Sequence, residues 1–261
     1  MKLCWLSDTH LDHADEWVRM ALAEKCANES DAVVITGDVT SGTELKLLAE
    51  FATDYGKPVY FILGNHDYWG GSFASVTKAV RAMCRRQSNL IWLDDSPPIR
   101  LTPTVQLCGV GGWYDAQFGD PEARDFIMHD WLRIEDLRPH YYAGSLVPKC
   151  QELGTDSAMK ATAKLLSTDA ERVIFATHIP PFVESAWHNG QPTEPSLLPW
   201  YTNKAMGFAL NRFAGKRPQG KLTTLCGHVH SASRFEARKN HTVLTAAAEY
   251  KNPVIERVFQ L

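Results

Sequence analysis

Five apolar segments of the sequence each end in side chains that can bind a metal ion. These segments have the length and composition of buried strands, and the polar residues follow each segment within a few positions. The residues are Asp8 and His10, Asp38, Asn65 with His66, His178, and His228 with His230. Carboxylate and imidazole groups together suit ions such as manganese, iron or zinc. A lone histidine after a strand is usually structural or solvated, so the chemistry depends on whether these side chains converge.

The third of these endings admits two interpretations. After the apolar run at 59–63, the chain presents an amide, an imidazole and a carboxylate in succession at Asn65, His66 and Asp67. One interpretation is a surface turn in which Gly64 and Asn65 supply unusual backbone angles. The other is a ligand site, because helix-flanked parallel sheets bind their ligands at the carboxyl ends of their strands.

The elements that must position these residues alternate between strand and helix in the first third of the chain. Strands are expected at 2–6, 32–35 and 59–63, and helices at 15–28, 43–55 and after Ser72, a favourable N-cap. This order predicts a mostly parallel sheet with right-handed crossovers. Because parallel strands end at one edge of their sheet, the polar endings should meet there.

The remainder of the chain is less regular. Short strands are expected at 90–93, 98–101 and 105–110, a helix at 121–137, an irregular connection at 139–155 and a helix at 157–166. Later strands are expected at 172–176, 222–226, 242–245 and 254–259, with a helix at 203–213. The sequence has no internal repeat or low-complexity segment, so a single domain over residues 1–261 is expected.

The composition is that of an ordinary globular protein, with 44% hydrophobic and 22% charged residues. A formal net charge of -3 gives no global electrostatic case for binding nucleic acid or an anionic membrane, although a local basic groove is compatible with it. No apolar run reaches the roughly 18 residues of a membrane span. The six cysteines form no CxxC pair, and the apolar region at the N-terminus is short for a signal peptide, so a cytoplasmic location with reduced thiols is expected.

The order of the motifs resembles the calcineurin-like metallophosphoesterases. The chain has Asp-x-His after the first strand, Gly-Asp after the second, Gly-Asn-His-Asp after the third, a later His, and a closing Gly-His-x-His. The additional arginines of the Ser/Thr protein phosphatase motifs are missing, so the resemblance is to the bacterial-type phosphoesterase branch. It implies an α/β fold: a four-layered α-β-β-α sandwich of two mixed sheets flanked by helices, with a dinuclear metal site at the strand carboxyl ends.

The resemblance also implies a role for each motif residue. Asp8, His10 and His230 would bind one divalent ion, Asn65, His178 and His228 would bind the other, and Asp38 would bridge them. The ions would be Mn, Fe or Zn. A metal-bridging hydroxide would attack a phosphodiester or phosphomonoester, with His66 as the general acid. Asp67 would orient His66 through a hydrogen bond and raise its pKa.

The substrate is open at this stage. A small-molecule phosphate ester is expected, a nuclease or a cyclic-nucleotide phosphodiesterase is the alternative, and a non-catalytic scaffold of the same fold is a third reading. The oligomeric state is also open. Substrate contacts are expected from variable loops at 113–160 and 182–205. The candidates are Tyr68, Trp113, Tyr114 and His188, whose alternative role is to pack the loops against the body of the protein. Arg212, Lys216, Arg217 and Lys221 form either a basic rim or a solvated helix end.

Overall fold

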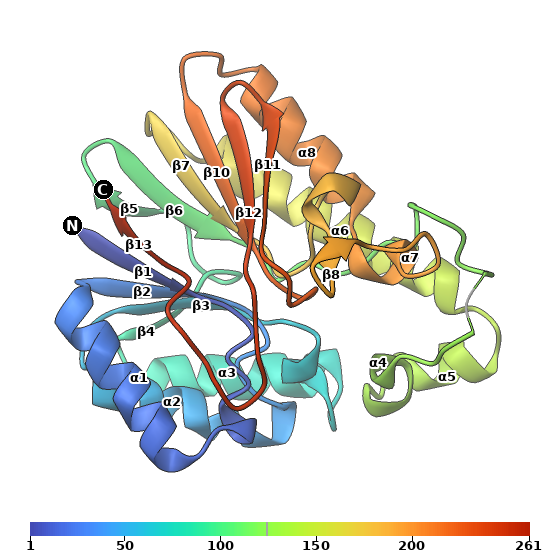
Figure 1. The fold of residues 1–261 in the computed structure, drawn as a ribbon, viewed down its shortest axis with the longest axis horizontal. Helices are drawn as coiled ribbons and strands as arrows, with labels where there is room; N and C mark the ends of the chain where they lie inside the picture. The colour runs from blue at the N-terminus through green and yellow to red at the C-terminus, as the bar shows by residue number, and fades with distance from the viewer. Residues whose placement is uncertain (124) are drawn as a thin grey trace.

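Apolar residues on both faces of the strands give the protein two sheets that pack on one another and on outer helices. The computed structural model describes residues 1–123 and 125–261. In the first strand, Leu3 and Trp5 point into a core shared by both sheets, whereas Cys4 and Leu6 point into a core beneath the helices. This alternation follows from the period of two along a strand. The fold is therefore a four-layered sandwich, as predicted, with helices on the two outer faces (Figure 1).

The first sheet is parallel except at one edge. Its order is β13-β1-β2-β3-β4, and only β13 runs antiparallel to its neighbour. The strands are β1 (Lys2–Leu6), β2 (Ala32–Thr36), β3 (Val59–Ile62), β4 (Leu90–Trp92) and β13 (Arg257–Gln260). The helices α1 (Glu16–Glu29), α2 (Lys46–Tyr55) and α3 (Phe73–Arg86) cover its outer face (Figure 1). The Ser72 side chain caps α3 by accepting a hydrogen bond from the Ser75 amide, as the sequence predicts.

The second sheet is parallel in its centre and antiparallel at both edges. Its order is β11-β12-β10-β7-β6-β5. The strands are β5 (Ile99–Thr102), β6 (Val105–Gly109), β7 (Arg172–Ala176), β10 (Lys221–Cys226), β11 (Ser233–Arg238) and β12 (His241–Thr245). The long helices α6 (Leu146–Leu166) and α8 (Lys204–Gly215) pack on its outer face. The edge strand β11 was not expected from the sequence, because its residues carry little apolar character.

Short elements lie around the carboxyl edges of the sheets. They are the helices α4 (His129–Arg133), α5 (Arg138–Tyr142) and α7 (Leu198–Tyr201), the strands β8 (Trp187–His188) and β9 (Gln191–Pro192), and single 3-10 turns at Leu11–His13, Gly42–Glu44, His66–Tyr68 and Val183–Ser185. The chain ends lie close together because β1 pairs with β13 (Figure 1). No helix in the described ranges is both long and apolar enough to cross a lipid bilayer.

Two expectations for the middle of the chain are wrong. Of the helix expected at 121–137, the described residues 121–123 and 125–137 form only α4, because the Arg133 carbonyl and the Glu135 amide bond to Gly70 and Gly71 instead of continuing a helix. The irregular connection expected at 139–155 is mostly helical, formed by α5 and the first half of α6. Pro148 lies in the first turn of α6, where a backbone N–H has no intrahelical acceptor to lose.

Candidate dinuclear metal centre

The predicted ligands stand on strained backbone at the carboxyl ends of the strands. Eight described residues other than glycine have positive φ, and five of them are predicted metal ligands: Asp8, His10, Asp38, His228 and His230, with φ between 39° and 70°. Such a conformation costs about 1–3 kcal/mol per residue and persists only where the surroundings enforce it. The concentration of strain where the carboxyl edges of the two sheets meet indicates a functional site.

Two glycines in the motifs allow the loops to approach one another. A Cβ added to Gly64 would lie 2.2 Å from Oδ1 of Asp38, and one added to Gly227 would lie 2.0 Å from Oδ2 of Asp8. No side chain fits at either position. The glycines of the third and fifth motifs therefore bring the backbone against the carboxylates of the first two.

One group of side chains consists of Asp8, His10, Asp38 and His230, whose ligand atoms lie within 4.8 Å of one another. The two imidazoles face each other through their Nε2 atoms at 3.3 Å. His230 Nε2 is also 3.5 Å from Oδ1 of Asp8. The backbone amide of His228 donates a hydrogen bond to the same Asp8 oxygen at 2.9 Å, which fixes the carboxylate.

A second group shares Asp38 with the first and adds His178 and His228. Asn65 completes it: its Oδ1 lies 3.0 Å from Nε2 of His178 and 2.9 Å from Nδ1 of His228. His178 Nε2 lies 3.3 Å from Oδ1 of Asp38. Because one carboxylate belongs to both groups, the arrangement suits two ions side by side.

The hydrogen bonds of the two histidines in the second group test whether a cation fits. The other ring nitrogen of His178 faces the carbonyl of Thr36 at 2.9 Å, and that of His228 faces the carbonyl of Trp200 at 3.0 Å. A neutral imidazole donates from the nitrogen that faces a carbonyl, so its second nitrogen presents a lone pair. Both lone pairs then point at the Oδ1 atom of Asn65, itself an acceptor. With the amide in this orientation, a proton or a cation between these atoms resolves the conflict.

The spacing of the ligand atoms also fits a metal ion. Neighbouring ligands of an ion with bonds of about 2.1 Å lie about 3.0–3.4 Å apart in octahedral or tetrahedral geometry. Five of the ligand-atom separations lie between 2.9 and 3.5 Å. The site therefore suits two divalent ions, and its oxygen and nitrogen donors do not by themselves select one metal.

The pKa values of the side chains at the site indicate that it favours positive charge. Burial raises the pKa of Asp8, but the His230 hydrogen bond and the nearby imidazoles outweigh it and lower the pKa to about 2. Burial alone would lower the pKa of His178, yet the charge of Asp38 raises it to about 10. Burial lowers the pKa of His228 to about 3, which leaves it neutral and able to bind a metal.

Asp67 does not perform the role expected for it. Its carboxylate accepts hydrogen bonds from the backbone amides of Val39 at 3.1 Å, Thr40 at 2.9 Å and Gly64 at 2.8 Å. The expected hydrogen bond to His66 is not among those of the described residues. Asp67 instead ties the loop after β2 to the loop after β3.

His66 lies at the site without being one of the grouped ligands. Its ring stacks on Trp69, with 3.5 Å between ring centroids, and its Nε2 is 3.9 Å from Oδ2 of Asp38. Nδ1 has no partner among the described residues. Burial lowers the pKa of His66 to about 4, contrary to the rise expected from Asp67. The imidazole is therefore neutral near pH 7 when no substrate is bound.

A cleft of about 620 Å³ opens over the ligands. His188, a candidate substrate contact, lines it together with Tyr201 and two residues of the loop after β12, Glu249 and Tyr250. The Tyr250 ring lies 4.5 Å from the His10 ring and 5.3 Å from the His230 ring, measured between centroids. Sequence reasoning missed Tyr250 because no motif or strand ending marks it.

The other predicted substrate contacts are corrected by the structure. Trp113 and Tyr114 are 4% and 0% exposed and belong to an aromatic core beside the cleft. Tyr68 packs edge-on against Phe73 and Trp113. None of the three lines the cleft, because their rings fill the space between α3, α6 and the third motif. His13, by contrast, lies near the site, with its ring 5.0 Å from that of Tyr250.

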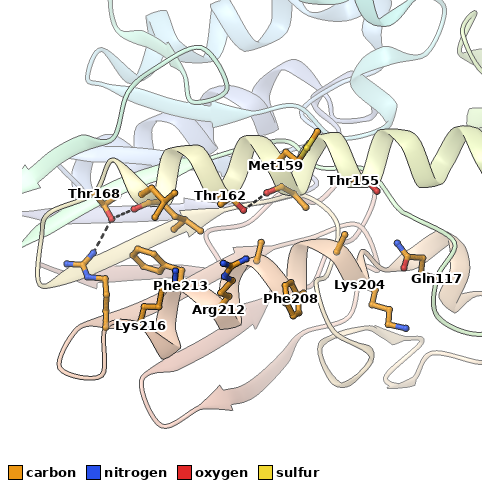
Figure 2. A pocket seen from close by; sticks show the side chains of 16 residues that line it. Gln117, Thr155, Met159, Thr162, Thr168, Lys204, Phe208, Arg212, Phe213 and Lys216 are labelled. Carbon is orange, nitrogen blue, oxygen red and sulfur yellow. Dashed lines mark hydrogen bonds between the residues drawn. The ribbon is translucent and has the colours of Figure 1, made fainter.

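The basic residues near the C-terminal end of α8 lie away from the cleft. A second cavity of about 620 Å³ runs between α6 and α8, and Figure 2 shows Arg212 and Lys216 beside Phe208 and Phe213 along it. Arg217 also lines this groove and donates a hydrogen bond to the Ala170 carbonyl at 2.6 Å. Because the two cavities share no lining residue, these cations do not form a rim around the metal centre.

The chain is similar to known proteins in both sequence and fold. A model of the family described as calcineurin-like phosphoesterase matches residues 1–232. A dimetal phosphatase from Danio rerio is 12% identical, with a TM-score of 0.59, over 98% of this chain and 88% of that one. A 5'-nucleotidase from Candida albicans SC5314 is 13% identical, with a TM-score of 0.50, over 94% of this chain and 45% of that one. No curated protein matches the sequence significantly. These structural likenesses show a shared fold.

Proposed function

Because the chain belongs to the calcineurin-like phosphoesterase family and is thereby a metal-dependent phosphoric ester hydrolase, we propose that its strand-end residues hold two divalent ions. Asp8, His10 and His230 bind one ion, Asn65, His178 and His228 bind the other, and Asp38 bridges them. The observation that carries this proposal is the convergence of acceptor atoms on two points that share Asp38. When bound, such ions polarise the phosphoryl group and make water a nucleophile near neutral pH.

The protein's own residues then have distinct tasks. Asp38 supplies the negative charge that reduces repulsion between two neighbouring cations. His66 points its Nε2 towards the same space, 3.9 Å from Asp38, and assists the departing alkoxide as the general acid. Because the pKa of His66 is low, a bound anionic phosphate must raise this pKa before the ring can transfer a full proton. Until then the neutral ring offers an N–H hydrogen bond to the leaving oxygen.

We favour a phosphodiester of a small molecule as the substrate. Glu249 places a carboxylate on the cleft wall, so a monoanionic diester meets less repulsion there than a dianionic monoester. Tyr201 and Tyr250 offer aromatic surfaces for the ester groups. A cyclic nucleotide is within this class, and a nuclease activity is the alternative. The six free cysteines support a reducing compartment such as the cytoplasm.

The test compares bis-p-nitrophenyl phosphate with p-nitrophenyl phosphate as substrates of the metal-stripped protein, reconstituted with Mn²⁺, Fe²⁺ or Zn²⁺. A higher kcat/KM for the diester supports the proposal, and a preference for the monoester contradicts the substrate class. Absence of turnover of both substrates with every ion would favour the non-catalytic scaffold. Nucleotides, cyclic nucleotides and single-stranded DNA, assayed next, separate a nucleotide phosphodiesterase from a nuclease.

A further inference from the structure

A buried carboxylate in α4 contacts the third motif from a distant part of the chain. Asp130 is 1% exposed and accepts hydrogen bonds from three side chains. Its Oδ1 accepts from Nδ2 of Asn65 at 2.9 Å and from Nε1 of Trp69 at 2.7 Å. Its Oδ2 accepts from the hydroxyl of Tyr114 at 3.2 Å. Nothing in the motifs requires a carboxylate at this position.

The contact with Asn65 decides which end of the amide faces the metal centre. The two ends of an asparagine amide have almost the same shape, but only the oxygen can bind a cation. Because Nδ2 donates to Asp130, Oδ1 must point the opposite way, towards His178 and His228. If the amide turned over, its N–H groups would face the imidazole nitrogens and occupy their lone pairs.

We propose that Asp130 is a positioning residue that holds the Asn65 amide with its oxygen towards the second ion. The proposal rests on the metal centre of the proposed function. It also predicts selectivity, because among the described residues Asn65 is the one proposed ligand that the hydrogen bonds of Asp130 reach, and that ligand serves one ion. The first ion, at Asp8, His10 and His230, should bind normally without Asp130.

Three substitutions at this position separate hydrogen bonding from charge and packing. Asp130→Leu removes the acceptor, and Asp130→Ala does so with a smaller side chain if the leucine variant does not fold. Asp130→Asn keeps an oxygen acceptor for Asn65 and places its amide nitrogen opposite the Tyr114 hydroxyl, which can accept. Tyr114→Phe is the matched control, since it removes one hydrogen bond of Asp130 and leaves the Asn65 contact in place.

The experiment is calorimetric titration of each full-length, metal-stripped protein with MnCl₂, together with thermal unfolding. The original protein, Asp130→Asn and Tyr114→Phe should bind two ions. Asp130→Leu and Asp130→Ala should bind one ion normally and the other 10–100 times more weakly, the effect typical of losing a group that orients a ligand. A merely structural role would lower the unfolding temperature of these variants without altering one site selectively.

The outcomes separate this inference from the proposed function. The original protein, Asp130→Leu and Asp130→Ala could all bind two ions with the same affinities. In that case Asp130 has no positioning role and the metal centre stands. Equal weakening of both ions would also overturn the inference, because it would mean general damage to the site. If the original protein binds no Mn²⁺, and no Zn²⁺ or Fe²⁺ in the same titration, the metal centre is overturned and the inference fails with it.

Discussion

The Nε2 atoms of His10 and His230 lie 3.3 Å apart although 220 residues separate them in the chain. One follows β1 in the first sheet, and the other follows β10 in the second. The ligand set therefore spans both sheets and forms only when they are packed together. A cation bound there contacts the folded protein and has no equivalent site in the unfolded chain.

Metal binding should consequently stabilise the protein against unfolding. A ligand that binds only the folded state at 100 times its dissociation constant adds about 2.7 kcal/mol. We expect the midpoint of thermal unfolding to rise when Mn²⁺ is added to metal-stripped protein and to fall again with EDTA. Differential scanning calorimetry checks this, with Ca²⁺ as a control ion that prefers more oxygen ligands. An unchanged midpoint with Mn²⁺ would contradict a centre shared by the two sheets.

Asp38→Asn should remove both ions together with the activity. Asp38 belongs to both ligand groups, and its carboxylate is further held by the backbone amide of His66 at 2.9 Å. A neutral amide would leave two cations without their shared anion. We expect less than one ion per chain after dialysis and a loss of at least about 100-fold in kcat/KM. Elemental analysis and the diester assay measure the two effects, and retention of two ions at a normal rate would exclude the bridging role.

His66→Ala should retain two ions and lose turnover. General acid catalysis contributes about 10²–10⁴-fold, and more for alkyl than for nitrophenyl esters, because alkoxides are the poorer leaving groups. Comparing kcat for both ester types in this variant reports the leaving-group dependence. Trp69→Phe keeps an aromatic ring beside the imidazole but also removes the hydrogen bond from Nε1 to Asp130, so its metal content is measured together with its turnover. Full activity of the alanine variant on an alkyl ester would remove His66 from the mechanism.

The convergence of the polar strand endings could be predicted because each of them stands next to a strong local signal. A buried strand such as β1 or β7 is readable from its apolar run, and the polar residue that follows it is fixed in position by the strand. The contacts of Asp67 could not be predicted in this way, because three backbone amides from two loops decide them. Local sequence specifies the strand ends but not the loop conformations between them.

Residues that reach the site from outside the motifs carry no sequence signal that marks them. Asp130 stands 65 positions from Asn65, in the short helix α4, which ends at Arg133 because the backbone there bonds to Gly70 and Gly71 instead of continuing the expected helix. The start of α6 was missed for a related reason. Gly154 looks like a helix breaker, but a Cβ there would lie 2.4 Å from the Cβ of Asp115, so the glycine serves helix packing.

Tyr250→Ala should weaken substrate binding more than turnover. Its ring forms part of the cleft wall and lies tilted against the His10 ring, and this contact does not require its hydroxyl. Loss of one aromatic contact worth about 1 kcal/mol corresponds to a rise in KM of about 5–10-fold. Tyr250→Phe keeps the ring and should resemble the original enzyme. Steady-state kinetics on the diester would contradict this if kcat fell while KM stayed constant.

His241 should make the protein less stable in mild acid. This fully buried imidazole lies away from the metal centre and bonds to Asn211 at 2.9 Å and Thr224 at 3.0 Å. Burial lowers its pKa to about 4, with opposing influences from Glu236, which raises it, and Arg238, which lowers it. Below pH 6.5, His241 takes up a proton in the unfolded chain but not in the folded protein. The stability that is present above that pH is therefore lost as the pH falls towards 4.

The matched variant His241→Gln can keep both hydrogen bonds but does not titrate. Between pH 7 and pH 5, the linkage relation gives a loss of about 2 kcal/mol for the histidine protein beyond that of the variant. Urea unfolding at a series of pH values, with EDTA present to remove metal effects, measures the difference directly. Because every other titrating group is common to the two proteins, parallel stability curves would mean that His241 is not held neutral.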